Sequence, residues 1–217
     1  MDLTYKKEDI ISEYNLSAEL KEDFMKVKWG SFQSMINRYY LALNELPFSN
    51  SKSWLDVGCG TGGLQTIISK LFPHINGLGI DLNSKLISFA LEKKIIGVEF
   101  RVLDFMELKN DTYDLITCLG VIQKANFTLK QFFQHVAELL KHDGMLLVDT
   151  KNIDWKKFHD QKYIPEPIHQ WFSVHQIRNA LKTSGLKEIK ISGFLPSENR
   201  LVKPNESHTF FLKAQKN

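Results

Sequence analysis

The sequence is poor in cysteine and in net charge, and both shortages exclude classes of protein. Its two cysteines, Cys59 and Cys118, cannot hold together a secreted fold of 217 residues, and neither sits in a metal-site spacing. The 28 Lys+Arg against 25 Asp+Glu leave a net charge of only +3, with the lysines scattered. Nucleic-acid binders concentrate positive charge in a stripe or patch. We therefore expect no bound metal and no nucleic-acid partner.

The sequence also lacks long apolar runs, internal repeats and low-complexity tracts. Residues 1–20 mix acidic side chains and lysines among apolar ones, and so do not contain the apolar region of a signal peptide. Nowhere does an apolar stretch approach the roughly 20 residues that cross a membrane. These absences favour a cytoplasmic protein with no membrane partner, while the oligomeric state stays open.

Two patterns of apolar residues divide the chain. Residues 14–46 place apolar side chains at three- and four-residue steps, which predicts helix as far as Pro47. From residue 53 short apolar strands alternate with helices, which predicts parallel strands with helices on both faces of the sheet. The predicted strands are 53–57, 77–80, 98–103, 113–119 and 145–150, and the predicted helices are 64–72, 84–94 and 128–141.

The last part of the chain departs from this alternation. A helix is predicted at 173–184 with Gly185 at its end, and two strands follow at 188–194 and 208–214 with no helix between them. A parallel pair would need a crossover of about a dozen residues or more, so these two strands are expected to pair antiparallel. The expected fold is a doubly wound α/β sheet of seven strands, mostly parallel with an antiparallel last strand, plus N-terminal helices.

Residues 54–62, WLDVGCGTG, run from a strand through a glycine loop into a helix, where backbone can approach a ligand closely. The glycines Gly58, Gly60 and Gly63 also satisfy the dinucleotide fingerprint G-x-G-x-x-G, so a nicotinamide cofactor has to be weighed. Asp56 argues against it, because a carboxylate beside the loop repels a pyrophosphate and suits S-adenosylmethionine, which carries a net positive charge. The alternative role for Asp56 is that of a loop cap.

Acidic residues also end the second and third predicted strands. Asp81 follows Gly62 by about 20 residues, where a carboxylate can accept hydrogen bonds from both ribose hydroxyls of either cofactor. Asp104 can accept from the adenine amino group, and Phe105 can form an apolar wall beside it. The alternatives are a helix cap for Asp81, a turn residue for Asp104 and a core residue for Phe105.

Residues 54–151 resemble the class I methyltransferase domain, the seven-stranded Rossmann-like family that uses S-adenosylmethionine. The resemblance implies that the loop 58–62 cradles the methionine part of the cofactor, with the backbone near Leu119 facing its amino acid end. It also implies that Leu82 packs on adenine. The stretches that match, in order and with the family's spacing, are 55–62, 79–81, 103–105, 113–116 and 139–144.

Upstream, Trp29 and the three residues after it, followed by Arg38, resemble an N-terminal helix segment of some small bacterial methyltransferases. That resemblance implies that Arg38 pairs with the cofactor carboxylate, a role that suits its planar guanidinium. A surface position for Arg38 is the alternative. The predicted cofactor-binding residues are Arg38, Asp56, Gly58, Gly60, Asp81, Leu82, Asp104, Phe105 and Leu119.

The segments on either side of these motifs are expected to complete the site. Residues 1–48 are too few for a core of their own and are predicted to form a helical cover, with residues 49–217 as the methyltransferase domain. Ligands of open α/β sheets lie beyond the carboxyl ends of the strands, so an acceptor lid is expected around 152–172. The predicted acceptor pocket consists of the aromatic residues Trp155, Phe158, Tyr163 and Trp171.

The resemblance assigns no catalytic base, because residues 121–124, VIQK, stand where many small-molecule members carry a histidine. His159 and His169 in the lid are candidates, although a base is needed only when the acceptor atom is protonated. The predicted function is transfer of a methyl group from S-adenosylmethionine to an oxygen, nitrogen, sulfur or carbon atom of a small molecule. A catalytically silent binding module and a nicotinamide-dependent oxidoreductase are the alternatives.

Overall fold

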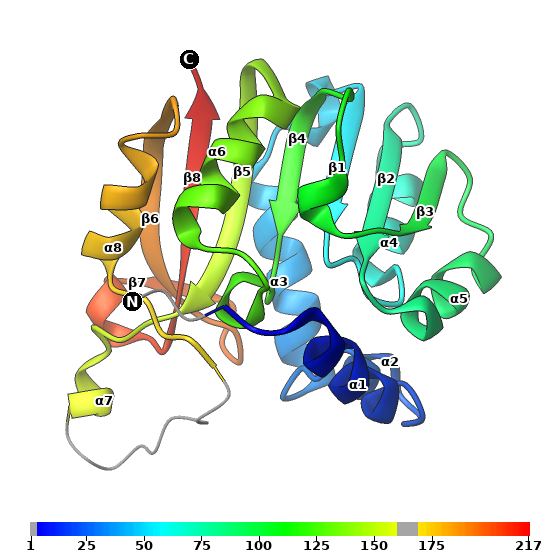
Figure 1. Ribbon diagram of the computed structural model, residues 1–217, viewed down its shortest axis with the longest axis horizontal. Coiled ribbons are helices and arrows are strands. Elements are labelled where there is room, and N and C mark those ends of the chain that lie inside the picture. The colour runs from blue at the N-terminus through cyan, green and yellow to red at the C-terminus, as the bar shows by residue number, and fades with distance from the viewer. Residues whose placement is uncertain (1–3, 160–168) are drawn as a thin grey trace.

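The computed structural model describes residues 4–159 and 169–217 (Figure 1). Within these ranges eight strands form one sheet, in the order β3-β2-β1-β4-β5-β8-β6-β7. The strands, in chain order, are β1 Ser53–Val57, β2 Asn76–Asp81, β3 Val98–Val102, β4 Tyr113–Cys118, β5 Leu140–Lys151, β6 Leu186–Leu195, β7 Arg200–Val202 and β8 Thr209–Lys216.

The pairing of these strands confirms the predicted fold class. β1 pairs in parallel with β2 and β4, β2 with β3, and β4 with β5. β8 lies antiparallel between β5 and β6, as predicted for the last two strands. The prediction of seven strands is wrong by one, because the chain turns at residues 196–199 and returns along β6 as the edge strand β7. Three residues, RLV, are too few to show an alternating pattern.

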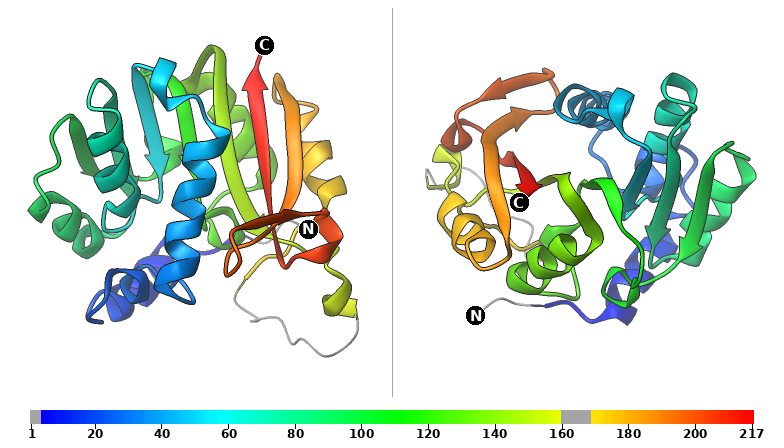
Figure 2. Two further views of the ribbon diagram at one scale, coloured as in Figure 1. Left: turned by 180° about the vertical axis from the view of Figure 1, so that it is seen from behind. Right: turned by 90° about the horizontal axis from the view of Figure 1, so that it is seen from above.

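Helices cover both faces of the sheet, as Figure 2 shows from behind and from above. Alternate residues of β5 pack to opposite sides, because Leu146 and Val148 join the core beneath α6 and α8, whereas Leu147 joins the core beneath α3 and α4. No helix in the described ranges is both long and apolar enough to cross a membrane. The helices are α1 Lys7–Ser17, α2 Asp23–Lys26, α3 Phe32–Glu45, α4 Gly63–Leu71, α5 Ser84–Glu92, α6 Leu129–Leu139, α7 Lys156–His159 and α8 Val174–Leu181.

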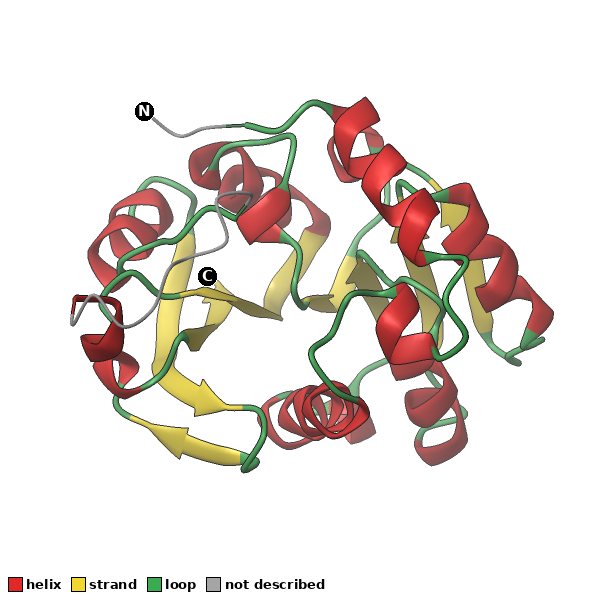
Figure 3. Cartoon of the chain, turned by 90° about the horizontal axis from the view of Figure 1, so that it is seen from below, coloured by secondary structure: helices red, strands yellow, loops and turns green. Residues whose placement is uncertain are grey.

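The helix predicted across residues 14–46 is broken into shorter helices, and the breaks allow the N-terminal residues to cross the carboxyl ends of the strands. Leu16 and Leu20, two members of the apolar pattern, are 75% and 47% exposed because the chain leaves the first helix between them. Lys28 takes a left-handed backbone conformation after α2, and Ser31 then caps α3. With these breaks, α1 and α2 run across the carboxyl ends of the parallel strands, as seen from below in Figure 3.

Candidate active site

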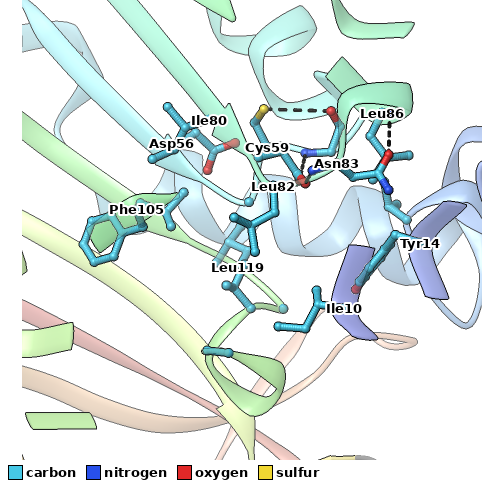
Figure 4. Close-up of a pocket in the computed structure, with 18 of the residues that line it drawn as sticks. Ile10, Tyr14, Asp56, Cys59, Ile80, Leu82, Asn83, Leu86, Phe105 and Leu119 are labelled. Atoms are coloured by element: carbon cyan, nitrogen blue, oxygen red, sulfur yellow. Dashed lines mark hydrogen bonds between the residues drawn. The ribbon is translucent and has the colours of Figure 1, made fainter. Parts of the chain in front are cut away.

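A cavity lies at the carboxyl ends of β1 to β4, beneath α1 (Figure 4). Its roof includes Ile10, Ile11 and Tyr14 of α1, and its walls come from the loops that follow the four strands. This is the edge of an open α/β sheet at which ligands bind. The lining is mainly apolar with a few polar groups, which is the composition of small-molecule sites.

The glycine loop brings bare backbone to the cavity wall. Gly58 and Gly60 have positive φ angles of 72° and 54°. A Cβ on Gly58 would lie 2.3 Å from Val121 Cγ2, and one on Gly60 would lie 2.5 Å from Val27 Cγ1. The N–H of Gly58 donates to the carbonyl of Ile80 at 2.8 Å, which fastens the loop to β2. Only glycine fits these two positions.

Asp56 reaches the cavity wall, but both of its carboxylate oxygens are bonded inside the protein. Oδ1 accepts from the Thr117 hydroxyl at 2.5 Å, and Oδ2 accepts from the Gln65 amide at 2.7 Å. The Trp54 indole N–H donates to the same Thr117 oxygen at 2.8 Å, so this network joins β1, β4 and α4. Burial raises the pKa of Asp56 to about 7, against the opposing effect of its two hydrogen bonds. The charge at this wall therefore changes near neutral pH.

Asp81 ends β2 and stands beside the glycine loop. Its Oδ2 accepts from the N–H of Gly60 at 3.0 Å, and its Oδ1 accepts from the N–H of Asn83 at 2.9 Å. Burial raises the pKa of Asp81, although the backbone hydrogen bonds favour the charged form. Leu82, next along the chain, also lines the cavity. Asp81 thus holds the loop, and each of its oxygens keeps capacity for a further donor.

Asp104 and Phe105 form the wall at the carboxyl end of β3. Asp104 Oδ2 accepts from the Asn126 amide at 2.8 Å and pairs with the Lys7 ammonium at 3.2 Å. The Phe105 ring lies 5.8 Å from the Phe127 ring in an edge-on arrangement. The structure therefore joins this wall to α1 through Lys7 and to the loop before α6 through Asn126 and Phe127.

Arg38 does not line the cavity. Its Nε donates to Asp149 Oδ2 at 2.9 Å, and its guanidinium stacks 4.2 Å from the centre of the Trp29 ring. The other Asp149 oxygen accepts from the N–H of Gly120 at 2.5 Å. Trp29 and Gly120 both line the cavity, so Arg38 lies behind its wall and supports two of its members.

The predicted acceptor aromatics are only partly within the described residues. Trp155 lies against His208, with 5.5 Å between ring centres, and the Lys151 ammonium lies 5.9 Å from the Trp171 ring. Neither tryptophan lines the cavity, and neither does His169. Tyr163 and the side chains of Phe158 and His159 lie outside the described part of the chain.

Three contributors to the cavity have no place in the sequence motifs. The residues of α1 form its roof, although α1 has only a weak apolar pattern. Asn83 caps α5 and also donates to the carbonyl of Ile11 at 3.2 Å, which ties α1 to the end of β2. Lys124, in the turn η3 Ile122–Lys124, is a buried lining residue. In the sequence, the signal for Lys124 is that it is the one charged residue in the segment 121–124, where many small-molecule members of the family carry a histidine.

Comparison with known proteins agrees with this geometry. A family model described as a methyltransferase domain matches residues 48–201. This chain belongs to that family. The family prediction made from the glycine loop and the strand-end motifs is thereby confirmed, and the fold places those motifs around a single cavity.

Individual relatives are distant. Ubiquinone biosynthesis O-methyltransferase from Rhodopseudomonas palustris (strain BisB5) is 28% identical over 156 residues, which cover 65% of this chain and 60% of that methyltransferase. The solved magnesium protoporphyrin IX methyltransferase from Synechocystis PCC 6803 has a TM-score of 0.68 at 14% identity, covering 98% of this chain and 100% of its own. The N-methyltransferase NodS from Bradyrhizobium japonicum WM9 has a TM-score of 0.68 at 15% identity, covering 95% and 97%. Both solved structures contain S-adenosylhomocysteine, and at these identities they share the fold with this methyltransferase domain.

Proposed function

We propose that this protein transfers a methyl group from S-adenosylmethionine to a small molecule. The observation that carries the proposal is a bare glycine backbone flanked by carboxylates. Gly58 and Gly60 have no room for a Cβ, which would overlap Val121 and Val27, and the carboxylates of Asp56 and Asp81 line the same cavity as this backbone. A sulfonium and an ammonium suit these carboxylates, whereas the pyrophosphate of a nicotinamide cofactor is repelled by them.

In this proposal the cofactor lies along the carboxyl ends of β1 to β3. The glycine loop and the backbone near Leu119 hold its methionine part, and Asp81 accepts from the ribose hydroxyls with the capacity that its backbone bonds leave. Leu82 and Phe105 enclose the adenine. Asp104 meets the adenine amino group beside its existing partners, and all these residues line one cavity.

We further propose that residues 1–48 cover the cofactor and do not form an independent domain. Helix α3 packs into the core of the sheet. Helix α1 is fastened to the end of β3 by Lys7, which pairs with Asp104 at 3.2 Å. The Asn83 amide fastens it to the end of β2 through the carbonyl of Ile11. A roof held at separate points keeps water from the site.

Methyl transfer requires alignment and the exclusion of water more than acid–base chemistry. The cofactor would supply a methyl group bound to a positively charged sulfur, which is a good leaving group. The chain's own part is to hold the sulfonium at the carboxyl end of β1, to close the cavity with α1, and to orient the acceptor. Arg38 contributes by fixing Trp29 and, through Asp149, Gly120.

The test is a screen of small-molecule acceptors with methyl-labelled S-adenosylmethionine and the full chain. Transfer of label to a compound, with release of S-adenosylhomocysteine, is the expected result. Binding of the cofactor without transfer to any acceptor would favour the catalytically silent module. A heat-treated sample and a Gly58→Ala variant serve as controls, because the added Cβ would lie 2.3 Å from Val121 Cγ2 and so force the glycine loop to shift.

A further inference from the structure

Lys124 is the one basic side chain among the described residues that line the cavity. It is only 8% exposed, and it comes from the turn that follows β4. The acidic residues of the lining, Asp56, Asp81 and Asp104, all come from the ends of β1 to β3. The cavity therefore has an acidic half at β1 to β3 and a single cation at β4.

The neighbours of Lys124 along the chain show which part of the cavity it faces. Val121 packs on Gly58, the first glycine of the loop. On the other side, Phe127 packs on Phe105, at the proposed adenine wall. Lys124 thus stands on the wall between the two ends of the proposed cofactor site. The sulfonium, which links the methionine part to the ribose, belongs to that middle region.

The counter-ion of Lys124 comes from the roof. Glu13 of α1 pairs with Lys124 through Oε2 and with Lys28 through Oε1. Glu13 therefore divides its charge between two ammonium ions. An ammonium has three donors, and Glu13 is the one partner of the Lys124 ammonium among the described residues. A buried ammonium that shares its carboxylate with a second lysine favours an anion beside it.

We propose that Lys124 selects an acceptor that presents a negatively charged oxygen, either a phenolate or a carboxylate. This inference rests on the proposed methyltransferase function. The acceptor loses its proton to solvent before it binds, and its oxygen lies between Lys124 and the sulfonium. A lone pair of the oxygen forms the bond to the methyl carbon while the carbon–sulfur bond breaks and leaves its electron pair on sulfur.

This assignment accounts for the lack of a histidine among the described lining residues and has a consequence for product release. A proton that leaves before binding makes a catalytic base unnecessary, and none of the described lining residues is a histidine. The reaction also neutralises both partners, since an anion and a cation become an ether or ester and a neutral sulfide. The product then loses its attraction to Lys124, which favours release. An ammonium acceptor is repelled by the same cation.

The probe for the test is para-nitrophenol, whose ionised form is coloured, added to the protein saturated with S-adenosylhomocysteine. Lys124 should hold the ionised form, so the pKa of the bound probe should fall below its value in water. Lys124→Met should weaken binding of the ionised probe by about tenfold to a hundredfold, the range expected for one charge-assisted hydrogen bond. Lys124→Arg should restore it. Glu13→Gln should strengthen it, because Lys124 then loses its competing counter-ion.

Lys130→Met is the matched control, since it removes the same charge from an exposed position in α6. Probe binding and affinity for S-adenosylhomocysteine should both be unchanged in that variant, and the Lys124 and Glu13 variants are compared at saturating S-adenosylhomocysteine so that a change in cofactor affinity does not affect the result. Preference for the neutral probe, failure of the probe to bind, or an unchanged Lys124→Met would overturn the inference. A wild-type protein that fails to bind S-adenosylhomocysteine would instead overturn the proposed function.

Discussion

The ends of β1 to β3 and the end of β4, with β5 behind it, form two halves of one cavity, and the chain builds them differently. In the first half the glycine loop is held by the next strand of the chain, because the N–H of Gly60 donates to Asp81 at 3.0 Å. In the second half the side chains depend on distant partners. Arg38 meets Asp149, which is 111 residues away, and Lys124 meets Glu13 of the roof.

The two halves should therefore respond differently to substitution. The first half consists mainly of backbone and carboxylates, which suit one fixed cofactor. The second half is assembled from α1, the β4 loop and β5, so its shape and charge change whenever any of the three changes. We therefore expect substitutions in the first half to affect cofactor binding, and those in the second to affect stability or acceptor choice.

Arg38→Met should give the largest effect, and it should be on stability. The substitution leaves Asp149, which is 2% exposed, without its cationic partner, and an uncompensated buried charge costs roughly 3–5 kcal/mol. Urea denaturation measures the loss. The double variant Arg38→Met with Asp149→Asn should recover part of it, since the neutral amide oxygen could still accept from Gly120. An Arg38→Met variant as stable as the wild type would contradict this role for the pair.

Gly58→Ala should abolish most cofactor affinity while Gly185→Ala should not. Both glycines have positive φ, 72° and 81°, so both substitutions carry a backbone strain of roughly 1–3 kcal/mol. A Cβ on Gly58 would also meet Val121 at 2.3 Å, whereas one on Gly185 would meet nothing within 4 Å. Calorimetry with S-adenosylhomocysteine separates the two effects. Equal affinity in the two variants would show that strain alone matters and that the loop does not approach the ligand.

Asp81→Ala should weaken binding of S-adenosylhomocysteine by roughly 1.5–3 kcal/mol for each charge-assisted hydrogen bond lost to the ribose. Asp81→Asn keeps one acceptor oxygen for the backbone of Gly60 or Asn83, and should bind with intermediate affinity. Denaturation of both variants measures the loss of unfolding free energy when the hydrogen bonds from Gly60 and Asn83 to Asp81 are removed. If affinity stayed at the wild-type value, Asp81 would be a loop cap alone.

These residues also mark how far the sequence could predict the site. The glycine loop and Asp81 can be predicted from the sequence because they lie in one strand–helix–strand unit, β1–α4–β2, in which the N–H of Gly60 donates to Asp81. The position of Arg38 behind the cavity wall cannot be predicted in the same way, because its partner Asp149 lies on a strand far along the chain. The sequence predicts that the N-terminal residues cover the site but does not predict which of them line it. The reason is that α1 lacks a strong apolar stripe and is held by polar contacts. Such contacts leave no periodic pattern in a sequence.

The smallest expected effect is a pH dependence of cofactor affinity. Burial raises the pKa of Asp56 to about 7, so a cationic ligand that favours its charged form should bind more weakly as pH falls below 7. The limit is roughly a tenfold loss per pH unit for one proton, with a plateau above 7. S-adenosylhomocysteine lacks the sulfonium and should show a shallower slope. The same slope for both ligands, or a slope that persists in the Asp56→Asn variant, would show that the charge of Asp56 does not affect cofactor affinity.

Parallel calorimetric titrations of the full chain test directly whether the ends of β1 to β3 form a site for S-adenosylmethionine. One titration uses S-adenosylhomocysteine and the other NAD, at the same pH and ionic strength. We expect saturable binding of S-adenosylhomocysteine and no heat from NAD, because the carboxylates of Asp56 and Asp81 line the cavity beside the glycine loop. Saturable binding of NAD with no response to S-adenosylhomocysteine would contradict this expectation.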